Sequence, residues 1–447
     1  MLPNLSENYL TRGFWGDEAW TSLISQLPYS RMLETTAADF HPPGYYSIVK
    51  TFYLFLPPTE IVTRSISFVF YLLTAFLVYK LASKIKDKKF ALWALALILV
   101  SPVFFTYAFE ARNYTMFTFA AIGSFYFLLN LIQNFNFKNA LFFIILSTLG
   151  IYTHYFMFFA LAAQGIYLVI FERKILLKMV ALYIAIAISY LPWIPFLYSQ
   201  ITSVNQSYWI SGINSKTHLE AIFRIFAGEN PSMLQYILFT SLVAILLFGL
   251  FIFLTQTLRK NSPFERRAYV LMWFWIVFSF VLASLPGLSI GPVNLPLRPI
   301  FFWRYLIPTV VPLSLLVAVS TYYLPKKILP VAAVLLVLTS LSLNYLTFQK
   351  YPTTFKQVYE NSVLPQISGN DTIVTVLPSF AEVLYYANQN NLGNKIVVLP
   401  EGLVQYSGKS LLDAYVENDR VYVENAPVSR YFELTPGPNL KIVGGGY

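Results

Sequence analysis

Long apolar segments constrain this chain more than any other feature of its sequence. Several windows of about 20 residues carry almost no charge, and a helix of that length spans a hydrocarbon core of ~30 Å. Only 12% of the 447 residues are charged and 57% are hydrophobic, whereas roughly 25% are charged in an average soluble domain. The pattern predicts a polytopic α-helical membrane protein.

We expect about ten transmembrane helices. They lie at approximately 60–81, 90–108, 113–133, 140–156, 157–171, 178–198, 234–257, 268–288, 304–323 and 328–347. The two segments between 140 and 171 are short for membrane spans, so the boundary between them could fall elsewhere.

Lysine and arginine divide the connecting segments into two alternating sets. The connections that contain "KLASKIKDKK", "NFNFKN", "FERKILLK", "LRKNSPFERR" and "PKK" hold 15 Lys and Arg residues. The opposite, longer connections hold Arg12, Arg31, Lys50, Arg112, Lys216, Arg224, Arg298 and Arg304. Because basic residues are enriched in cytoplasmic loops, we expect the second set and both chain ends outside the cytoplasm. The net charge of +10 therefore reflects topology, and it does not indicate nucleic-acid binding, which would gather basic residues on one polar face.

Residues 348–447 differ in character from the spans. The β-rich runs "TIVTVL", "KIVVL" and "RVYVE" are separated by polar turns and by expected helices near 354–366 and 379–390. We therefore expect a first extracytoplasmic loop at 1–59, a transmembrane helical domain at 60–347 and a small extracytoplasmic α/β domain at 348–447. The chain has no cysteine, which excludes disulfides, zinc-thiolate sites and cysteine nucleophiles.

The amino end is unusual for a segment expected outside the cytoplasm. No hydrophobic span precedes residue 60. The acidic residues of this segment are Glu7, Asp17, Glu18, Glu34 and Asp39. Because such a segment is difficult to translocate without a preceding apolar helix, we expect the natural protein to have a further span upstream. Coding DNA without an in-frame hydrophobic segment at that place would refute this expectation.

Four polar segments are expected to meet at the outer membrane surface. They are "WGDEAW" at 15–20, "HPPGYY" at 41–46, "FEARNY" at 109–114 and "FFWRYLIP" at 301–308. Few ionisable residues lie near the middle of a span, whereas ion-coupled transporters normally place acids or bases there. The distribution favours a site at the outer surface.

In combination these segments resemble the GT-C class of membrane glycosyltransferases, specifically bacterial relatives of the dolichyl-phosphate-mannose protein mannosyltransferases and of aminoarabinose transferase. The matching residues are Trp15, Asp17, Glu18, His41, Pro42, Pro43, Tyr45, Tyr46, Glu110, Ala111, Arg112, Tyr114, Arg304, Tyr305 and Pro308. The resemblance implies a GT-C-like fold in the cell (inner) membrane. It also implies transfer of a sugar, hexosyl or pentosyl, from a polyprenyl-phosphate donor to an extracytoplasmic protein, lipid or cell-wall glycan.

The implied reaction assigns roles to four charged residues. An acceptor hydroxyl must lose a proton as it attacks the anomeric carbon, and Asp17 is the expected general base. Inverting displacement needs no second carboxylate as nucleophile, so Glu18 would orient Asp17, an acceptor or a metal. Arg112 and Arg304 would bind the donor phosphate and stabilise its growing charge.

Other residues of the matching segments are expected to bind substrate or support the site. They are His41, Tyr45, Tyr46, Glu110, Tyr114, His154 and Tyr305. Simpler explanations stay open: interfacial tyrosines often form an aromatic belt, and interfacial arginines often extend toward lipid phosphates. A divalent metal, held by histidine with a carboxylate as in some relatives, also stays open, although no close ligand spacing supports it.

Two alternatives to the glycosyltransferase compete with it. A lipid-linked-sugar flippase or another transporter needs two access states, and repeated halves or broken central helices would support it. A noncatalytic scaffold whose terminal domain binds cell-wall polymer would be indicated by loss of Asp17, which this sequence retains.

Overall fold

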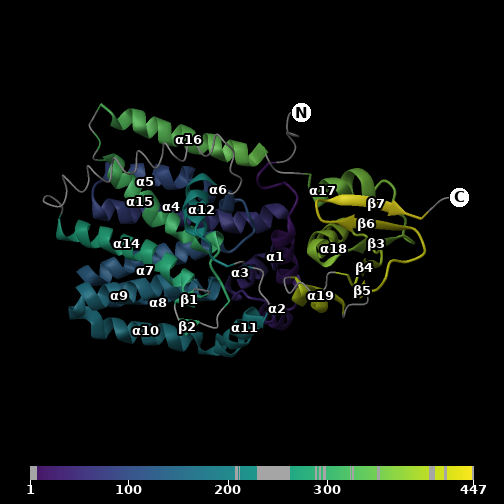
Figure 1. Ribbon diagram of the computed structural model, residues 1–447, viewed down its shortest axis with the longest axis horizontal. Coiled ribbons are helices and arrows are strands. Elements are labelled where there is room, and N and C mark those ends of the chain that lie inside the picture. The colour runs from purple at the N-terminus through teal and green to yellow at the C-terminus, as the bar shows by residue number, and fades with distance from the viewer. Residues whose placement is uncertain are drawn as a thin grey trace.

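The computed structural model describes most of the chain. The described residues are 8–206, 210, 212–228, 262–286, 289–290, 293–294, 298–322, 324, 327–349, 353–401, 408–416 and 420–444. The span expected at 234–257 lies outside them. Within them, a bundle of helices forms one part of the molecule and a small α/β domain forms the other, as Figure 1 shows.

Most helices of the bundle run roughly parallel to the long axis of the molecule (Figure 1). The bundle helices are α4 (Glu60–Ile85), α5 (Lys88–Val100), α6 (Pro102–Ala108), α7 (Tyr114–Gln133), α8 (Phe137–Thr153), α9 (Met157–Phe171), α10 (Leu176–Tyr190), α11 (Ile194–Gln206), α14 (Pro263–Ser284), α15 (Val310–Tyr322) and α16 (Leu329–Gln349). Several short elements lie in the connections. They are the helix α12 (Thr217–Ala227), the 3₁₀ turns η1 (Arg173–Ile175), η2 (Leu191–Trp193) and η3 (Trp303–Thr309), and the antiparallel pair β1 (Ser289–Ile290) and β2 (Val293–Asn294).

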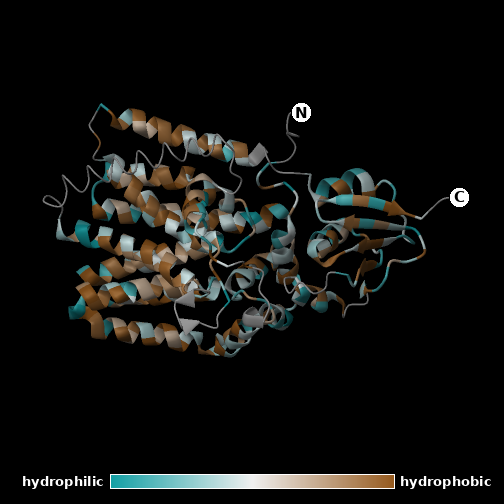
Figure 2. Cartoon of the chain, in the orientation of Figure 1, coloured by the Kyte–Doolittle hydropathy of each residue, from teal (hydrophilic) through white to brown (hydrophobic). Residues whose placement is uncertain are grey.

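Six of the expected membrane spans are confirmed in the described part of the chain. Six helical segments are long and apolar enough to cross a membrane: Glu60–Ile85, Tyr114–Gln133, Arg173–Ser203, Pro263–Ser284, Trp303–Tyr322 and Leu329–Thr347. The short pair expected between 140 and 171 is α8 and α9, of 17 and 15 residues. Many large apolar side chains on the bundle surface are exposed, and Figure 2 shows its helices as predominantly hydrophobic. The chain is therefore a polytopic membrane protein.

One expected span is broken. The segment expected at 90–108 consists of α5 and α6, which meet at an angle of 65°. Ser101, between them, has an extended backbone, and Pro102 starts α6. Proline lacks an N–H and disfavours the helical conformation of the residue before it, which explains the break.

The basic connections meet at one end of the bundle. Their contacts there are Arg267 Nε to Glu172 Oε1 at 2.9 Å, Lys84 Nζ to the Phe264 ring centroid at 5.7 Å, Lys178 Nζ to the Phe135 ring centroid at 5.1 Å and Lys86 Nζ to the Tyr322 ring centroid at 5.0 Å. The α/β domain lies beyond the opposite end (Figure 1). We call that opposite end the domain-facing end.

The first loop forms three helices at the domain-facing end. They are α1 (Gly16–Gln26), α2 (Tyr29–Ala37) and α3 (Gly44–Tyr53), and Figure 1 shows them between the bundle and the α/β domain. Helix α1 packs against α3 on one side and against helix α18 (Phe380–Gln389) of the α/β domain on another. The first loop thus connects the two parts of the molecule.

The α/β domain has a five-stranded sheet with the strand order β5-β4-β3-β6-β7. Its strands are β3 (Thr372–Thr375), β4 (Ile396–Val398), β5 (Val421–Val423), β6 (Tyr431–Thr435) and β7 (Asn439–Val443). The register pairs Ile373 with Ile396 and with Phe432, and Ile396 with Val421, all in parallel, whereas β6 and β7 pair antiparallel. Helices α17 (Phe355–Val358), continued by the π-turn η4 (Tyr359–Val363), and α18 confirm the two expected helices, and α19 (Lys409–Val416) is an addition.

Candidate active site

Asp17 lies at the beginning of α1, beside Arg112. Trp15 precedes the helix with an extended backbone, which places Asp17 and Glu18 in the first turn, where the helix dipole favours carboxylates. The Asp17 carboxylate is 41% exposed, and its Oδ2 lies 3.4 Å from Arg112 Nη2. Arg112 Nη1 also donates to the Asp17 carbonyl oxygen at 3.5 Å. Both contacts are long, so this guanidinium is not tightly engaged by Asp17.

Glu18 faces a different environment from its neighbour. Consecutive side chains on a helix point about 100° apart, and Glu18 is completely buried. Its Oε1 accepts from Arg64 Nε at 2.8 Å and from the backbone N–H of Ala111 at 2.8 Å, and its Oε2 accepts from Arg64 Nη2 at 2.6 Å. Burial alone would raise the pKa of Glu18, but the charge and hydrogen bonds of Arg64 outweigh it and lower that pKa. Glu18 is thus committed to Arg64 and positions the start of α1.

Arg112 is a buried cation in the turn between α6 and α7. It is 6% exposed, and its Nε has no hydrogen-bond partner among the described residues. Its guanidinium carbon lies 6.0 Å from the ring centroid of Tyr114. Glu110 does not pair with Arg112 but lies 3.9 Å from Arg12 Nη2. Arg112 therefore has one hydrogen-bond donor without a partner in the described part of the chain.

Asp17 and Arg112 line a cavity of about 170 Å³ that we call the reaction cavity. Its wall is completed by Gly16, Trp20, Asp39, Phe40, His41, Leu377, Pro378, Ala381 and Gly408. The His41 Nδ1 lies 3.2 Å from Asp39 Oδ2, so a carboxylate fixes the orientation of the imidazole. The cavity thus brings together two carboxylates, one guanidinium and one oriented histidine from three separate segments.

His154 lies next to this group, in the break between α8 and α9. Its ring stacks on Phe117 with 4.9 Å between the ring centroids and lies 6.4 Å from the ring of His41. Burial, with smaller effects of the charges of His41 and Arg112, holds the pKa of His154 well below its ordinary value. Its Nδ1 accepts the N–H of Phe156 at 3.1 Å, so the neutral ring carries its proton on Nε2.

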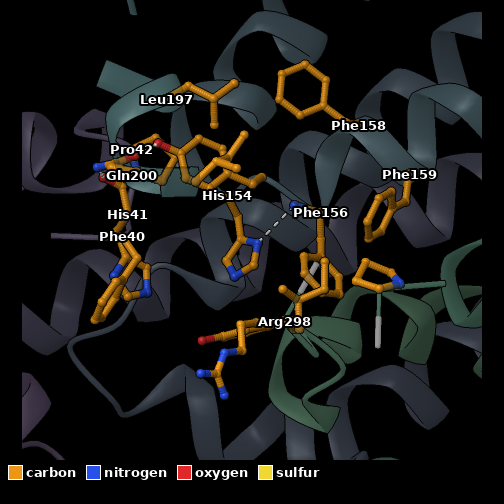
Figure 3. A pocket seen from close by; sticks show the side chains of 15 residues that line it. Phe40, His41, Pro42, His154, Phe156, Phe158, Phe159, Leu197, Gln200 and Arg298 are labelled. Atoms are coloured by element: carbon orange, nitrogen blue, oxygen red, sulfur yellow. Dashed lines mark hydrogen bonds between the residues drawn. The ribbon is translucent and has the colours of Figure 1, made fainter. Parts of the chain in front are cut away.

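A second, apolar cavity of about 330 Å³ adjoins the reaction cavity. The two share Phe40 and His41. Its lining is mainly aromatic and aliphatic and includes Phe156, Phe158, Phe159, Leu197, Ile201 and Tyr305. Figure 3 shows His154 in the middle of the view, with Leu197 and Phe158 on one side and Arg298 on the other. We call it the apolar cavity; its lining suits an apolar group.

Arg304 lies in η3, where aromatic rings surround its guanidinium. The guanidinium carbon is 5.5 Å from the Trp15 ring centroid and 5.7 Å from that of Trp303. The phenol of Tyr114 interacts electrostatically with both Arg304 and Arg112. The two arginines predicted from separate motifs are therefore brought to one region of the domain-facing end.

The remaining predicted residues are mostly interior. Tyr45 and Tyr46 are each 1% exposed. Tyr45 exchanges a hydrogen bond with Ser67 at 2.7 Å, and Tyr46 packs on Trp20 with 5.1 Å between ring centroids. Tyr305 packs on His154 at 4.8 Å. These tyrosines support the site from within, which differs from both an exposed sugar platform and an interfacial belt.

The described residues do not fit a metal site. No group of three or more His, Asp or Glu side chains gathers in the described part of the chain in a way that could hold an ion. Among the described residues, Asp39 is the one carboxylate that pairs with His41.

Sequence reasoning missed four residues around these cavities. Asp39 stands two positions before His41, and this spacing could have indicated the pair. Arg64 is a charged residue within an apolar helix, and such residues are usually retained for a specific partner. Gln200, which donates to the Thr36 carbonyl at 3.0 Å, and Glu382, on α18 of the α/β domain, have no local sequence signal.

Comparisons with known proteins agree with this architecture. The model of a family described as dolichyl-phosphate-mannose-protein mannosyltransferase matches residues 40–198. No curated protein sequence matches the chain significantly. Solved structures match over nearly its full length at low identity. The chain is similar to apo ArnT from Cupriavidus metallidurans, with a TM-score of 0.62, 12% identity, and 95% of this chain and 90% of that chain covered.

Two ligand-bound structures are also similar. ArnT from the same organism bound to undecaprenyl phosphate has a TM-score of 0.61 and 13% identity, with the same coverage of 95% and 90%. The archaeal oligosaccharyltransferase AglB from Archaeoglobus fulgidus, in complex with an inhibitory peptide and a dolichol-phosphate, has a TM-score of 0.51 and 12% identity, with 96% of this chain and 67% of that chain covered. At such identities the likeness concerns the fold.

Proposed function

We propose that this chain, a membrane glycosyltransferase of the GT-C class, transfers one sugar from a polyprenyl-phosphate carrier to a hydroxyl of an extracytoplasmic acceptor. The observation that carries the proposal is the pairing, within one cavity, of a partly exposed carboxylate with a buried guanidinium. Asp17 Oδ2 and Arg112 Nη2 are 3.4 Å apart, and Arg112 Nε has no hydrogen-bond partner among the residues that the structure describes. A base and a phosphate-binding cation are the two groups that this reaction requires.

In the proposed reaction, Asp17 accepts the proton of the acceptor hydroxyl as its oxygen attacks the anomeric carbon. The bond between that carbon and the phosphate oxygen breaks, and the polyprenyl phosphate leaves with the bonding electron pair. Arg112 binds the leaving phosphate through its free donor, and Arg304 adds a second positive charge nearby. A single displacement of this kind inverts the configuration at the anomeric carbon.

The lipid part of the donor is proposed to lie in the apolar cavity. This cavity has an aromatic and aliphatic lining and meets the reaction cavity at Phe40 and His41. An isoprenoid chain would bury its apolar surface there while its phosphate reaches Arg112. Undecaprenyl phosphate, the ligand in one of the two ArnT structures, is a molecule of this class.

The domain-facing end is proposed to lie outside the cytoplasm, in a cell membrane. The clustered basic connections at the opposite end support this orientation, because Lys and Arg are enriched on the cytoplasmic side. The proposed parts of the chain are an outer loop at 1–59, a membrane domain at 60–347 and an outer domain at 348–447. Accessibility labelling should find Lys86 in the cytoplasm and Ser215 outside, and the reverse result would invert the orientation.

The proposed function is tested with a panel of labelled polyprenyl-phosphate sugars. Membranes that contain the protein are incubated with each donor, and label is followed into lipid, protein and polymer fractions. Transfer of label from one donor class into a new covalent product is the expected result. Movement of intact donor across the membrane without a new product would instead support a flippase.

A further inference from the structure

A third cavity, of about 380 Å³, lies where the first loop, the bundle and the α/β domain meet. We call it the seam cavity. Trp15 lines it from the first loop, Glu110 and Arg304 line it from the bundle, and Glu382 lines it from the α/β domain. Several threonines and apolar side chains complete the wall, namely Thr106, Thr347, Thr353, Thr354, Phe14 and Phe355. Carboxyl, guanidinium, hydroxyl and indole groups on one wall suit a polar ligand rich in hydroxyls.

Glu382 has one carboxyl oxygen without a partner in the described part of the chain, although the carboxyl also interacts with the backbone N–H of Gly16. It is 7% exposed, and its Oε2 is buried without a hydrogen-bond partner among the described residues. A buried polar atom in this state is costly, so it is a reason to look for a ligand. Helix α18 packs against α1, and a Cβ added to Gly16 would lie 3.5 Å from Glu382 Oε1. The carboxyl therefore stands directly beside the start of the helix that carries Asp17.

The protonation state of Glu382 supports a hydrogen-bonding role. Burial raises its pKa to about 8, and the nearby charge of Asp17 adds to this effect. At neutral pH most molecules therefore carry a protonated Glu382, which can donate one hydrogen bond and accept another. A sugar hydroxyl both donates and accepts hydrogen bonds, so it can use both functions of a protonated carboxyl. An anionic group only accepts hydrogen bonds, so it would use only the O–H donor.

The position of the seam cavity relates it to the proposed reaction. It shares Pro378 with the reaction cavity. Trp15 lines the seam cavity, and Asp17, two positions later, lines the reaction cavity. The apolar cavity joins the reaction cavity at different residues, Phe40 and His41. The seam cavity therefore approaches Asp17 from another direction than the proposed lipid part of the donor.

We propose that the seam cavity binds a carbohydrate unit of the acceptor and that Glu382 is a residue that recognises its hydroxyl groups. This inference rests on the proposed function, because it takes Asp17 as the base that the acceptor must reach. It makes the α/β domain part of the acceptor site. The acceptor class would be a glycan rather than an isolated protein hydroxyl or an anionic lipid head group.

The first test measures binding without transfer. Full-length protein in nanodiscs is mixed with neutral oligosaccharides released from the envelope of the producing cells, and binding is followed by saturation-transfer NMR. Wild type and the exposed control Glu360→Ala should bind, whereas Glu382→Ala should bind at least 10-fold more weakly. Glu382→Gln should keep most of the binding, since an amide also donates and accepts. No binding by wild type, or equal binding by Glu382→Ala, would overturn the inference.

The second test separates this inference from the proposed function. With a labelled donor that supports transfer, Glu382→Ala should raise the KM for the oligosaccharides at least 10-fold and leave the KM for the donor unchanged. A change confined to the donor KM would show a donor site and contradict the inference. If wild type binds oligosaccharide but transfers sugar from no donor, the proposed function fails while the binding site stands. Thermal unfolding checks that Glu382→Ala is folded.

Discussion

The Glu18 carboxylate accepts two hydrogen bonds from the guanidinium of Arg64, at 2.8 Å and 2.6 Å, and both side chains are completely buried. Arg64 Nη1 also donates to the carbonyl of Leu10 at 3.0 Å, and its Nη2 donates to that of Gly13 at 3.1 Å. One arginine of the first bundle helix thus holds both the segment before α1 and the first turn of α1. This anchor leaves the neighbouring Asp17 at the cavity wall.

Glu18→Gln should lower the stability of the protein strongly. It should have a smaller effect on the rate of sugar transfer per folded molecule. Glutamine cannot neutralise Arg64, and an unpaired buried charge typically costs about 3–5 kcal/mol. Thermal unfolding in detergent measures the loss. The surface variant Glu34→Gln, at a carboxylate 65% exposed, is the control and should be nearly neutral. A Glu18→Gln protein of wild-type stability would contradict the anchoring role.

Asp17→Asn should reduce sugar transfer by about 100-fold or more, the range expected for a lost general base. Asparagine keeps the shape of the side chain but cannot take the acceptor proton. Thermal stability and donor binding should change little, because this side chain is partly exposed and its contact with Arg112 is long. The exposed Asp413→Asn is the matched control. Retention of more than about a tenth of the activity would remove Asp17 from the role of base.

Arg112→Lys should weaken donor binding by about 10-fold or more although the charge is kept. Lysine has no counterpart of the buried Nε–H and cannot bind a phosphate in the bidentate way of a guanidinium. Direct binding of a labelled polyprenyl-phosphate sugar measures the effect, with Arg31→Lys at a partly exposed surface ion pair as control. Wild-type affinity in Arg112→Lys would assign the arginine a structural role.

The stability of the protein should fall as the pH rises from about 5 to about 8, and Glu382 should be one cause. Its folded pKa of about 8 exceeds the ordinary value of 4.5, so the folded state binds the proton more tightly. The neutral carboxyl makes its full contribution to the free energy of unfolding below pH 4.5, and this contribution is lost as the pH rises to 8. Between these values the free energy of unfolding falls by up to about 1.4 kcal/mol per pH unit.

Glu382→Gln should flatten this dependence, because its amide does not titrate. The comparison is between thermal midpoints of wild type and variant at pH 5, 7 and 9. Other charged groups near Glu382, namely Asp17, Glu110, Arg12 and Arg304, are present in both proteins. Their effects therefore cancel in the difference. Parallel curves for the two proteins would contradict a protonated Glu382 at neutral pH.

Gly44→Ala should destabilise the segment that carries His41. A Cβ at Gly44 would lie 2.5 Å from the backbone carbonyl oxygen of Tyr152, so α3 or the end of α8 must shift. Overpacking of this kind typically costs about 1–3 kcal/mol. Gly165→Ala, in α9 with no atom within 4 Å of its new Cβ, is the control and should be neutral or stabilising. Equal thermal midpoints for the two variants would refute the close packing.

The membrane architecture could be predicted from the sequence alone. A run of about 20 apolar residues has to be a helix in a bilayer, because only a helix satisfies its backbone hydrogen bonds within one segment. The parallel strands β3, β4 and β5 were also predictable, because each is a short run rich in β-branched residues. The hairpin of β6 and β7 was not: β7 is an edge strand with mostly exposed side chains, so it lacks the apolar pattern that marks a strand.

The sequence also supplied the candidate residues, because its polar segments resemble those of GT-C glycosyltransferases, and that resemblance implies Asp17 as a base and two arginines for the donor phosphate. Only the tertiary structure decided which of these residues line the cavity and which are buried in an ion pair. Asp17 and Glu18 are adjacent and chemically similar, yet Arg64, 46 residues away, removes Glu18 from the cavity, while Arg112, 95 residues away, lines it with Asp17. Glu382 comes from a separate domain and depends on the packing of α18 against α1. Burial and ion pairing depend on contacts between distant segments, and local sequence does not encode which of two neighbouring side chains will find such a partner.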